Sequence, residues 1–185
     1  MKRILLVVLL VLIPALGWSF AKPLRLLFPQ LNGVVCHDSV CAEDSKSLAL
    51  ATEIYTKSIE HVLAKGITLE ARPNFVYCST FECYESFGGG NERAISYPFL
   101  GTIIGSNSWQ LYITQHELIH WFQFFELGAV STMTKPEWFR EGMAYEYSGA
   151  PNSDIPKHYL PMLVKYRNWH SDKSWPEVIR LAGEL

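Results

Sequence analysis

The segment His116-Glu-Leu-Ile-His120 lies inside residues 113–127, a stretch that is otherwise mostly apolar and aromatic. In a helix, residues four apart lie on one face, so His116 and His120 can direct both imidazoles at one ion. Glu117 projects about 100° further round the helix, where a carboxylate can take a proton from a metal-bound water. A helix this apolar is expected to be buried, and buried histidines need polar partners. The alternative is a pair of core histidines satisfied by backbone carbonyls.

Residues 136–147 predict a second helix, with Thr134 as N-cap, Pro136 in the first turn and Glu137 three residues after the cap. Apolar residues flank Glu141, so we expect its carboxylate to point inward, where it needs a cation. Two histidines and a glutamate form a three-ligand zinc site with the fourth position open to water.

These two helices resemble those of the gluzincin zinc metallopeptidases, the group that contains thermolysin and the large zinc aminopeptidases. The resemblance covers about residues 101–148. The His-Glu-x-x-His motif is followed by Trp138-Phe-Arg-Glu-Gly-Met-Ala144, similar to the Trp-x-x-Glu-Gly-x-Ala pattern of the family's third-ligand helix. The resemblance implies one zinc ion and a set of site residues: the ligands His116, His120 and Glu141, and the general base Glu117.

The resemblance also predicts how a peptide or protein substrate is held. In gluzincins the strand before the metal helix is the sheet edge that pairs with substrate backbone. That place is taken here by Thr102, Ile103 and Ile104. Family members commonly stabilise the oxyanion with a Tyr or His from beyond the third ligand. Independently of the family, Glu146 is a candidate to orient a zinc-bound histidine, although an exposed helix glutamate is the favoured interpretation. The oxyanion candidates are Tyr145, Tyr147, His158, Tyr159, Tyr166 and His170, of which Tyr159 and Tyr166 are preferred because they fall at the start of, or on, the following helix.

The activity implied is peptide hydrolysis by zinc-activated water, with Glu117 passing the proton to the leaving amine. The Gly-x-Met-Glu-Asn motif with which large aminopeptidases hold a free amino terminus is absent before His116. Aminopeptidase activity therefore does not carry over, and we expect an endo- or oligopeptidase. The alternative is a catalytically inactive zincin-fold envelope protein that binds zinc or a protein partner.

The remaining patterns predict an α+β fold with a small mixed sheet backed by an N-terminal helix. Apolar residues from Leu48 to Leu63 follow helical spacing up to Gly66, and short β-rich runs occupy residues 74–78, 93–97 and 101–105. We interpret Gly88-Gly-Gly90 as a flexible turn or hairpin connection, with a lid as the alternative. Together with the two motif helices, residues 46–185 are predicted to form one gluzincin-like metallopeptidase domain.

The N-terminus predicts export. Lys2 and Arg3 precede an apolar run from Ile4 to Ala21, so residues 1–21 are interpreted as a signal peptide or an N-terminal membrane anchor. We favour an uncleaved anchor, with residues 22–45 as an extracytoplasmic arm. The body of the protein would then face the periplasm or another extracytoplasmic space, or be secreted if the segment is cleaved.

Four cysteines form two like-spaced pairs, Cys36 with Cys41 and Cys78 with Cys83. An even number in an exported chain predicts disulfides, and these local bridges are the simplest of three pairings. The rival is a zinc ribbon, whose paired ligands are usually separated by two residues rather than four. A net charge of -2 gives no indication of nucleic-acid binding. The sequence does not indicate an oligomeric state.

Overall fold

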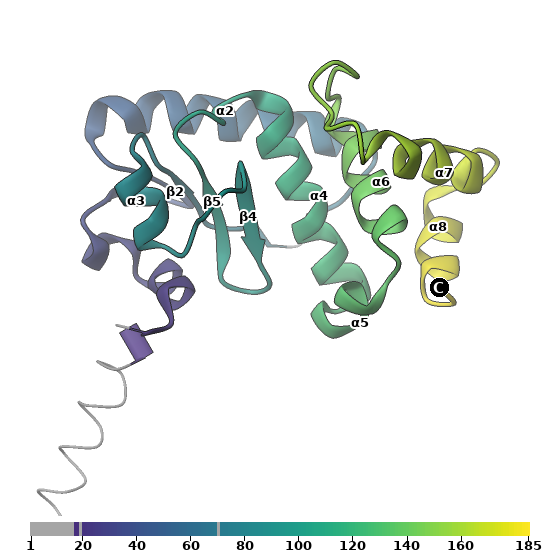
Figure 1. The fold of residues 1–185 in the computed structure, drawn as a ribbon, viewed down its shortest axis with the longest axis horizontal. Helices are drawn as coiled ribbons and strands as arrows, with labels where there is room; N and C mark the ends of the chain where they lie inside the picture. Colours follow the sequence, from purple (N-terminus) through teal and green to yellow (C-terminus); the bar gives the residue numbers. More distant parts are fainter. Residues whose placement is uncertain (1–16, 19, 70) are drawn as a thin grey trace, which may run out of the picture.

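The computed structural model describes residues 17, 18, 20–69 and 71–185. It has the predicted mixed α+β fold, in which a five-stranded sheet lies on one side of helix α4 and helices α6 to α8 lie on the other (Figure 1). The strands are β1 (Val35–His37), β2 (Val40–Ala42), β3 (Phe75–Tyr77), β4 (Ala94–Tyr97) and β5 (Gly101–Ile104). The α-helices are α2 (Ser45–Ala64), α3 (Phe81–Ser86), α4 (Leu111–Leu127), α5 (Ala129–Thr134), α6 (Glu137–Ser148), α7 (Leu160–His170) and α8 (Trp175–Ala182), preceded by the 3-10 helices η1 (Lys22–Leu27) and η2 (Pro29–Asn32).

The order of strands in the sheet is β1-β2-β3-β5-β4. The two middle pairings, β2 with β3 and β3 with β5, are parallel, and the outer two are antiparallel. Strand β5 is therefore an inner strand, and β4 forms the edge beside α4. The prediction that Thr102, Ile103 and Ile104 form a substrate-pairing edge is wrong, because these residues are fully buried and paired on both sides.

Helix α2 backs the sheet, as predicted. Its N-cap is Asp44, whose carboxylate accepts hydrogen bonds from the backbone N–H groups of Lys46 and Ser47. Its buried stripe includes Ile54, Tyr55, Ile59 and Val62, at the spacing of one helical face. These residues share one hydrophobic core with strands β2 and β3 and with helices α4 and α6.

Helix α4 is the central helix of the fold and carries the His-Glu-x-x-His motif. Leu118, Ile119 and Phe122 are buried in the shared core. A buried hydrogen bond of 3.0 Å between the hydroxyl oxygens of Thr114 and Tyr77 ties the helix to strand β3. Contacts with the sheet and with α6 fix α4 on both sides, so the side chains of its motif have a rigid support.

Helix α6 begins later than predicted. Thr134 is not its N-cap: it is the last residue of α5, a helix that the sequence patterns did not predict, and its hydroxyl donates to the carbonyl of Ser131. Pro136 caps α6, so Glu137 is the first helical residue rather than the third, and no capping box forms there. The later start leaves Glu141 within the helix, one turn after its first residue.

Gly142 lies where α7 crosses α6, and we expect Gly142→Ala to be destabilising. A Cβ at this position would lie 2.5 Å from the Cβ of Tyr166 and 2.8 Å from the carbonyl oxygen of Met162, so α7 would have to move. The loss in free energy of unfolding, measured by urea denaturation, should be about 1–3 kcal/mol despite alanine's helix preference. Gly183→Ala, at an exposed right-handed position after α8, is the control and should change stability by less than about 0.5 kcal/mol. Equal stability of the two variants would contradict this packing.

Gly88-Gly-Gly90 is not a hairpin connection, because helix α3 lies between β3 and these glycines. The glycines instead link α3 to β4. A Cβ on Gly89 would lie 2.3 Å from ring atoms of Tyr84, so the close approach of chain and ring requires glycine there.

Both predicted local disulfides are present. Cys36–Cys41 joins β1 to β2, and Cys78–Cys83 joins the end of β3 to α3. All four thiols are therefore oxidised, which excludes the zinc ribbon. Among the described residues no helix is long and apolar enough to cross a membrane. Most of the predicted N-terminal anchor, residues 1–16 and 19, lies outside the described residues, so its nature stays a prediction.

Candidate metal centre

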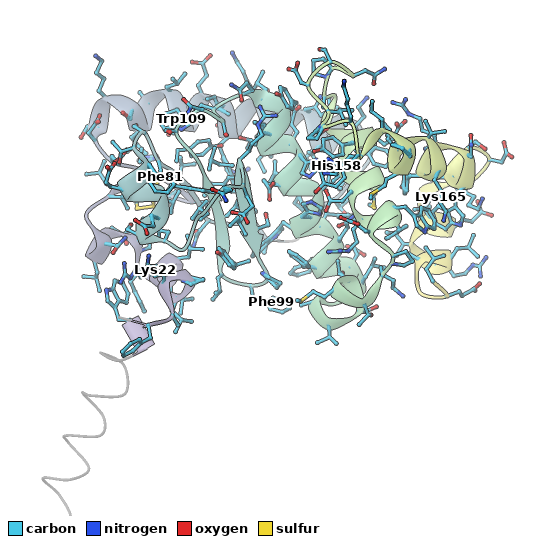
Figure 2. The ribbon with its side chains drawn as sticks, viewed as in Figure 1. Lys22, Phe81, Phe99, Trp109, His158 and Lys165 are labelled. Atoms are coloured by element: carbon cyan, nitrogen blue, oxygen red, sulfur yellow. A yellow bond between two sulfur atoms is a disulfide. The ribbon has the colours of Figure 1, made fainter. Side chains whose placement is uncertain are left out.

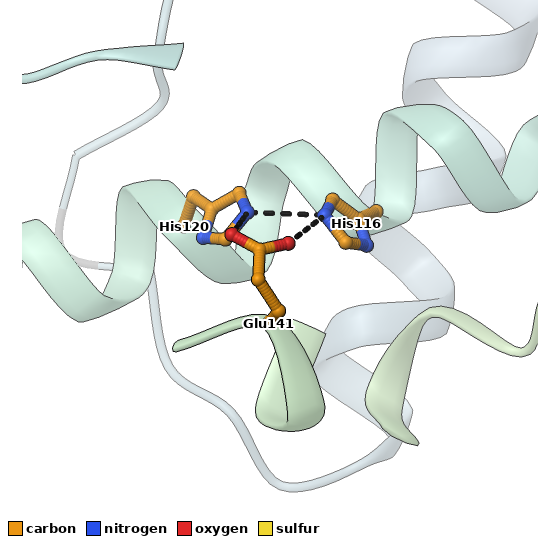
Figure 3. A group of neighbouring side chains, drawn as sticks. All are labelled: His116, His120 and Glu141. Atoms are coloured by element: carbon orange, nitrogen blue, oxygen red, sulfur yellow. Dashed lines mark hydrogen bonds and ion pairs between the residues drawn. The ribbon is translucent and has the colours of Figure 1, made fainter. Parts of the chain in front are cut away.

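Three side chains from two helices converge at one point, as Figure 3 shows. His116 and His120 extend from α4 with their Nε2 atoms 3.0 Å apart. Glu141 reaches them from α6, with one carboxylate oxygen 3.4 Å from Nε2 of His116 and the other 3.6 Å from Nε2 of His120. The three side chains are only 12–15% exposed. The predicted ligand set is thus brought together by the return of α6 across α4.

The separations of these atoms suit a single metal ion. An ion in tetrahedral coordination with bonds of about 2.0–2.2 Å holds its ligand atoms about 3.3–3.6 Å apart. The observed separations run from 3.0 to 3.6 Å, so small movements would bring all three atoms into range. The cluster can therefore hold one metal ion, and its geometry alone does not select the element.

Gln123 orients His120. The side-chain oxygen of Gln123 lies 3.0 Å from Nδ1 of His120, and its amide nitrogen donates to the backbone carbonyl of Arg140 at 2.9 Å. Because this arrangement makes the Gln123 oxygen an acceptor, Nδ1 of His120 must carry a proton, so in the neutral ring that a metal ion would require the lone pair lies on Nε2, which faces the cluster. Gln123 is fully buried, which fixes the amide in place.

For Glu146 the sequence favours an ordinary helix glutamate over this orienting role, and the structure does not give it the orienting role. Glu146 instead pairs with Arg167 on α7. The signal for Gln123 was a single polar residue in the aromatic run Trp121-Phe-Gln-Phe-Phe125, three residues after His120.

A cleft of about 550 Å³ opens over the cluster. Its walls are the free edge of β4, the motif face of α4, one face of α6 and the loop that leads into α7. Glu117 lines the cleft beside the two histidines and is itself 6% exposed. Ser96 of β4 holds the strand against α4 by donating to the backbone carbonyl of Glu117. The cleft thus places a carboxylate outside the ligand set but next to it.

The two preferred oxyanion candidates lie in different places. Tyr159 lines the cleft. Tyr166 does not: it is fully buried on the core side of α6, packed against Phe139 and Trp169, so its predicted role is wrong. A residue that was not preferred, Tyr145, lies instead against the ring of His116, with ring centroids 4.4 Å apart.

Tyr145 was detectable in the sequence because it follows Glu141 by four residues and so shares its helix face. Burial raises the pKa of Tyr145, and the carboxylate of Glu141 raises it further. Burial likewise raises the pKa of Tyr159. Both hydroxyls therefore stay protonated at neutral pH and can donate hydrogen bonds into the cleft.

The metal-free protein should lose stability as the pH rises from 6.5 to about 9. Burial lowers the pKa of His120, but the carboxylate of Glu141 outweighs it, and the net result is a rise from 6.5 to about 9. A group whose pKa is higher in the folded than in the unfolded protein contributes its full stabilisation at a pH below the unfolded-state pKa. That contribution is lost as the pH rises through the folded-state pKa. Denaturant titrations of chelator-treated protein across this range measure the effect.

The pairing of Glu141 with the two histidines has the opposite effect on the pKa of Glu141, which it lowers. Burial raises its pKa, but His120 and His116 outweigh burial and hold it below its ordinary value of 4.5, so that contribution is lost as the pH falls below 4.5. Glu141→Gln should therefore reduce the pH dependence of stability in both ranges, below pH 4.5 and between pH 6.5 and about 9. An unchanged slope between pH 6.5 and 9 in that variant would show that another group is responsible.

Comparison with known proteins finds no family model, no curated protein and no solved structure that matches this chain. The likeness to gluzincins therefore rests on the two motifs and on the cluster that they form. The function has to be argued from the residues of the cleft.

Proposed function

We propose that this protein is a zinc-dependent peptide hydrolase, an endo- or oligopeptidase of the gluzincin kind. The observation that carries the proposal is the convergence of His116, His120 and Glu141 at a cleft that also contains the buried carboxylate of Glu117. Two imidazoles and one carboxylate are the donor set of catalytic zinc sites that keep a position open. Zinc bound there would polarise the scissile carbonyl and lower the pKa of water.

Glu117 would act as the general base. It neighbours His116 in sequence but does not belong to the ligand cluster, and it lines the same cleft. From this position its carboxylate can accept a proton from the attacking water and deliver it to the leaving amine. Such proton transfer by a positioned side chain typically accelerates a reaction about 10²–10⁴-fold.

Strand β4 would bind the substrate backbone. It is the edge strand, and Ala94, Ile95 and Ser96 line the cleft next to the cluster. An edge strand offers unpaired N–H and C=O groups to an extended peptide, so strand addition can take place here. The role predicted for residues 102–104 thus moves to β4, one strand earlier in the chain.

Tyr145 and Tyr159 would stabilise the developing oxyanion. Their rings lie 5.3 Å apart, and both line the cleft. Because their hydroxyls are protonated at neutral pH, each can donate a hydrogen bond to negative charge on the scissile carbonyl oxygen. Tyr145 is the nearer to the cluster, since its ring packs on His116.

Removal and return of the metal tests the proposal. Chelator-treated protein should not hydrolyse unfolded casein, and one equivalent of zinc should restore the activity. Protein that carries a full equivalent of zinc and cleaves neither casein nor a mixed peptide library would instead be a non-enzymatic zinc-binding protein.

We also propose that the protein acts outside the cytoplasm, attached to a membrane. Two disulfides are typical of an oxidising compartment. The end of the N-terminal apolar segment and the arm that follows it expose large apolar side chains: Phe20 in the segment, and Leu27, Phe28 and Leu31 in the arm. Exposed apolar residues next to an apolar segment favour contact with lipid.

Two further elements, the β4–β5 hairpin and α5, expose apolar side chains, and both elements lie along the same, lower edge of the molecule in Figure 1. Phe99, labelled in Figure 2, lies at the tip of the β4–β5 hairpin and is 64% exposed, with a φ of 63° that is rare for a bulky residue. Val130 and Met133 extend from α5 and are 79% and 65% exposed. Membrane fractionation with an intact-mass measurement tests the attachment. Release of full-length protein by a high-salt wash would contradict it.

A further inference from the structure

Arg140 lines the cleft without a partner for its side chain. It precedes Glu141 on α6, and its Nε atom is buried and has no hydrogen-bond partner. Among the described residues its guanidinium makes no ion pair, although the carboxylates of Glu92, Glu117 and Glu141 line the same cleft. A buried, unsatisfied donor of a charged group is costly unless a ligand supplies the acceptor.

The other arginine of the cleft, Arg93, is already satisfied by the protein. It donates to the hydroxyl of Tyr112 at 2.8 Å and to the side-chain oxygen of Gln110 at 3.3 Å. Its guanidinium also lies over the Tyr112 ring, 5.4 Å from the centroid. Arg93 is solvent-exposed, so water can satisfy its remaining donors. The two arginines of the cleft thus differ: the side chain of Arg93 is hydrogen-bonded within the protein, whereas the Nε atom of Arg140 is not.

The backbones of the two arginines lie near opposite ends of the cleft. Arg93 contacts Tyr112, one turn before His116 on α4. The backbone carbonyl of Arg140 is bound by Gln123, three residues after His120. The ligand cluster therefore lies between them, and a peptide that crosses the cluster toward the His120 end approaches Arg140.

We propose that Arg140 binds a carboxylate of the peptide substrate at the His120 end of the cleft. This inference rests on the proposed peptidase function and specifies its substrate class. A guanidinium offers a planar pair of donors that matches a carboxylate, and such charge-assisted bonds are about twice as strong as neutral ones. A divalent ion in the cluster would add to the attraction, since it would make the cleft net positive.

The direction of the bound peptide decides which carboxylate Arg140 meets. Strand β4 runs from the Arg93 end of the cleft toward Glu117, because Ser96, one residue before the end of the strand, donates to the Glu117 carbonyl. A peptide antiparallel to β4 would bring its N-terminal half to Arg140, where the carboxylate would be a Glu or Asp side chain. A parallel peptide would bring its free C-terminal carboxylate.

Binding of three pentapeptides to metal-free full-length protein, measured by calorimetry, tests the proposal. The first is blocked at both ends and contains one glutamate, the second replaces that glutamate by glutamine, and the third is the glutamine peptide with a free C-terminus. Metal-free protein is used because a peptide carboxylate could otherwise ligate the ion itself. We expect the glutamate or the free-acid peptide to bind about 10–100-fold more tightly than the neutral one. The tighter of the two identifies the source of the carboxylate.

The variants assign the preference to a residue. Arg140→Gln should abolish it, Arg140→Lys should retain part of it, and Arg93→Gln should leave it intact. Urea denaturation of each variant checks that it is folded. Equal binding of all three peptides by the native protein, or loss of the preference in Arg93→Gln rather than Arg140→Gln, would overturn the proposal. Because no step involves hydrolysis, a carboxylate preference without any peptidase activity would refute only the proposed function.

Discussion

Glu117→Gln is expected to keep the bound metal ion and to lower kcat for peptide hydrolysis by about 10²–10⁴-fold. Glutamine has the size of glutamate and can occupy the same buried position, but its amide cannot accept the proton of the attacking water. The ion should stay because Glu117 does not belong to the ligand cluster formed by His116, His120 and Glu141. Loss of rate without loss of metal is the signature of a general base.

The measurement pairs zinc stoichiometry with steady-state hydrolysis of one peptide. Glu92→Gln is the matched control, because Glu92 is another carboxylate that lines the cleft but does not neighbour the histidines. Its kcat should stay within a few-fold of the native value. A Glu117→Gln variant that hydrolyses at the native rate would remove Glu117 from the chemistry, and one that loses its zinc would make Glu117 a ligand.

The ligands could be predicted from the sequence because each depends on a local rule. His116 and His120 are one helical turn apart, so their common face follows from helix geometry alone. The prediction for Glu141 also required that the following helix returns across α4. Its apolar neighbours indicated that its carboxylate faces inward. The partners of these residues depend on tertiary packing, which explains why Gln123 was missed and Tyr166 was misplaced.

The edge strand was misassigned because position along the chain does not fix position in a sheet. Strand β5 comes immediately before α4 in sequence, yet β4 folds back antiparallel and takes the edge. The composition of β5 fits an inner strand: Gly101-Thr-Ile-Ile has no charged residue and ends in two adjacent isoleucines, as expected of a strand covered on both faces. The start of α6 was misplaced because the short helix α5 has no strong apolar period and was not predicted, so its last residue, Thr134, was taken as the N-cap of α6.

Glu141→Ala should weaken zinc binding by more than 100-fold. The substitution leaves two imidazoles and removes the one carboxylate of the ligand set, so the ion loses both a bond and a compensating negative charge. Gln123→Leu provides a scale, because it keeps all three ligands and removes the group that orients His120, together with that group's hydrogen bond to the Arg140 carbonyl, and such outer partners typically contribute about 10–100-fold in metal affinity. The expected order of affinity is therefore native, then Gln123→Leu, then Glu141→Ala.

Competition with a chromophoric chelator at constant pH measures these affinities. Glu137→Ala is the control, since this glutamate lies one turn earlier on α6, is exposed, and should bind zinc as the native protein does. If Glu141→Ala held zinc as tightly as Glu137→Ala, two histidines would be enough to account for binding. The cleft would then lack the three-ligand geometry with an open position on which peptide hydrolysis depends. That result would favour the alternative, a catalytically inactive protein that binds zinc.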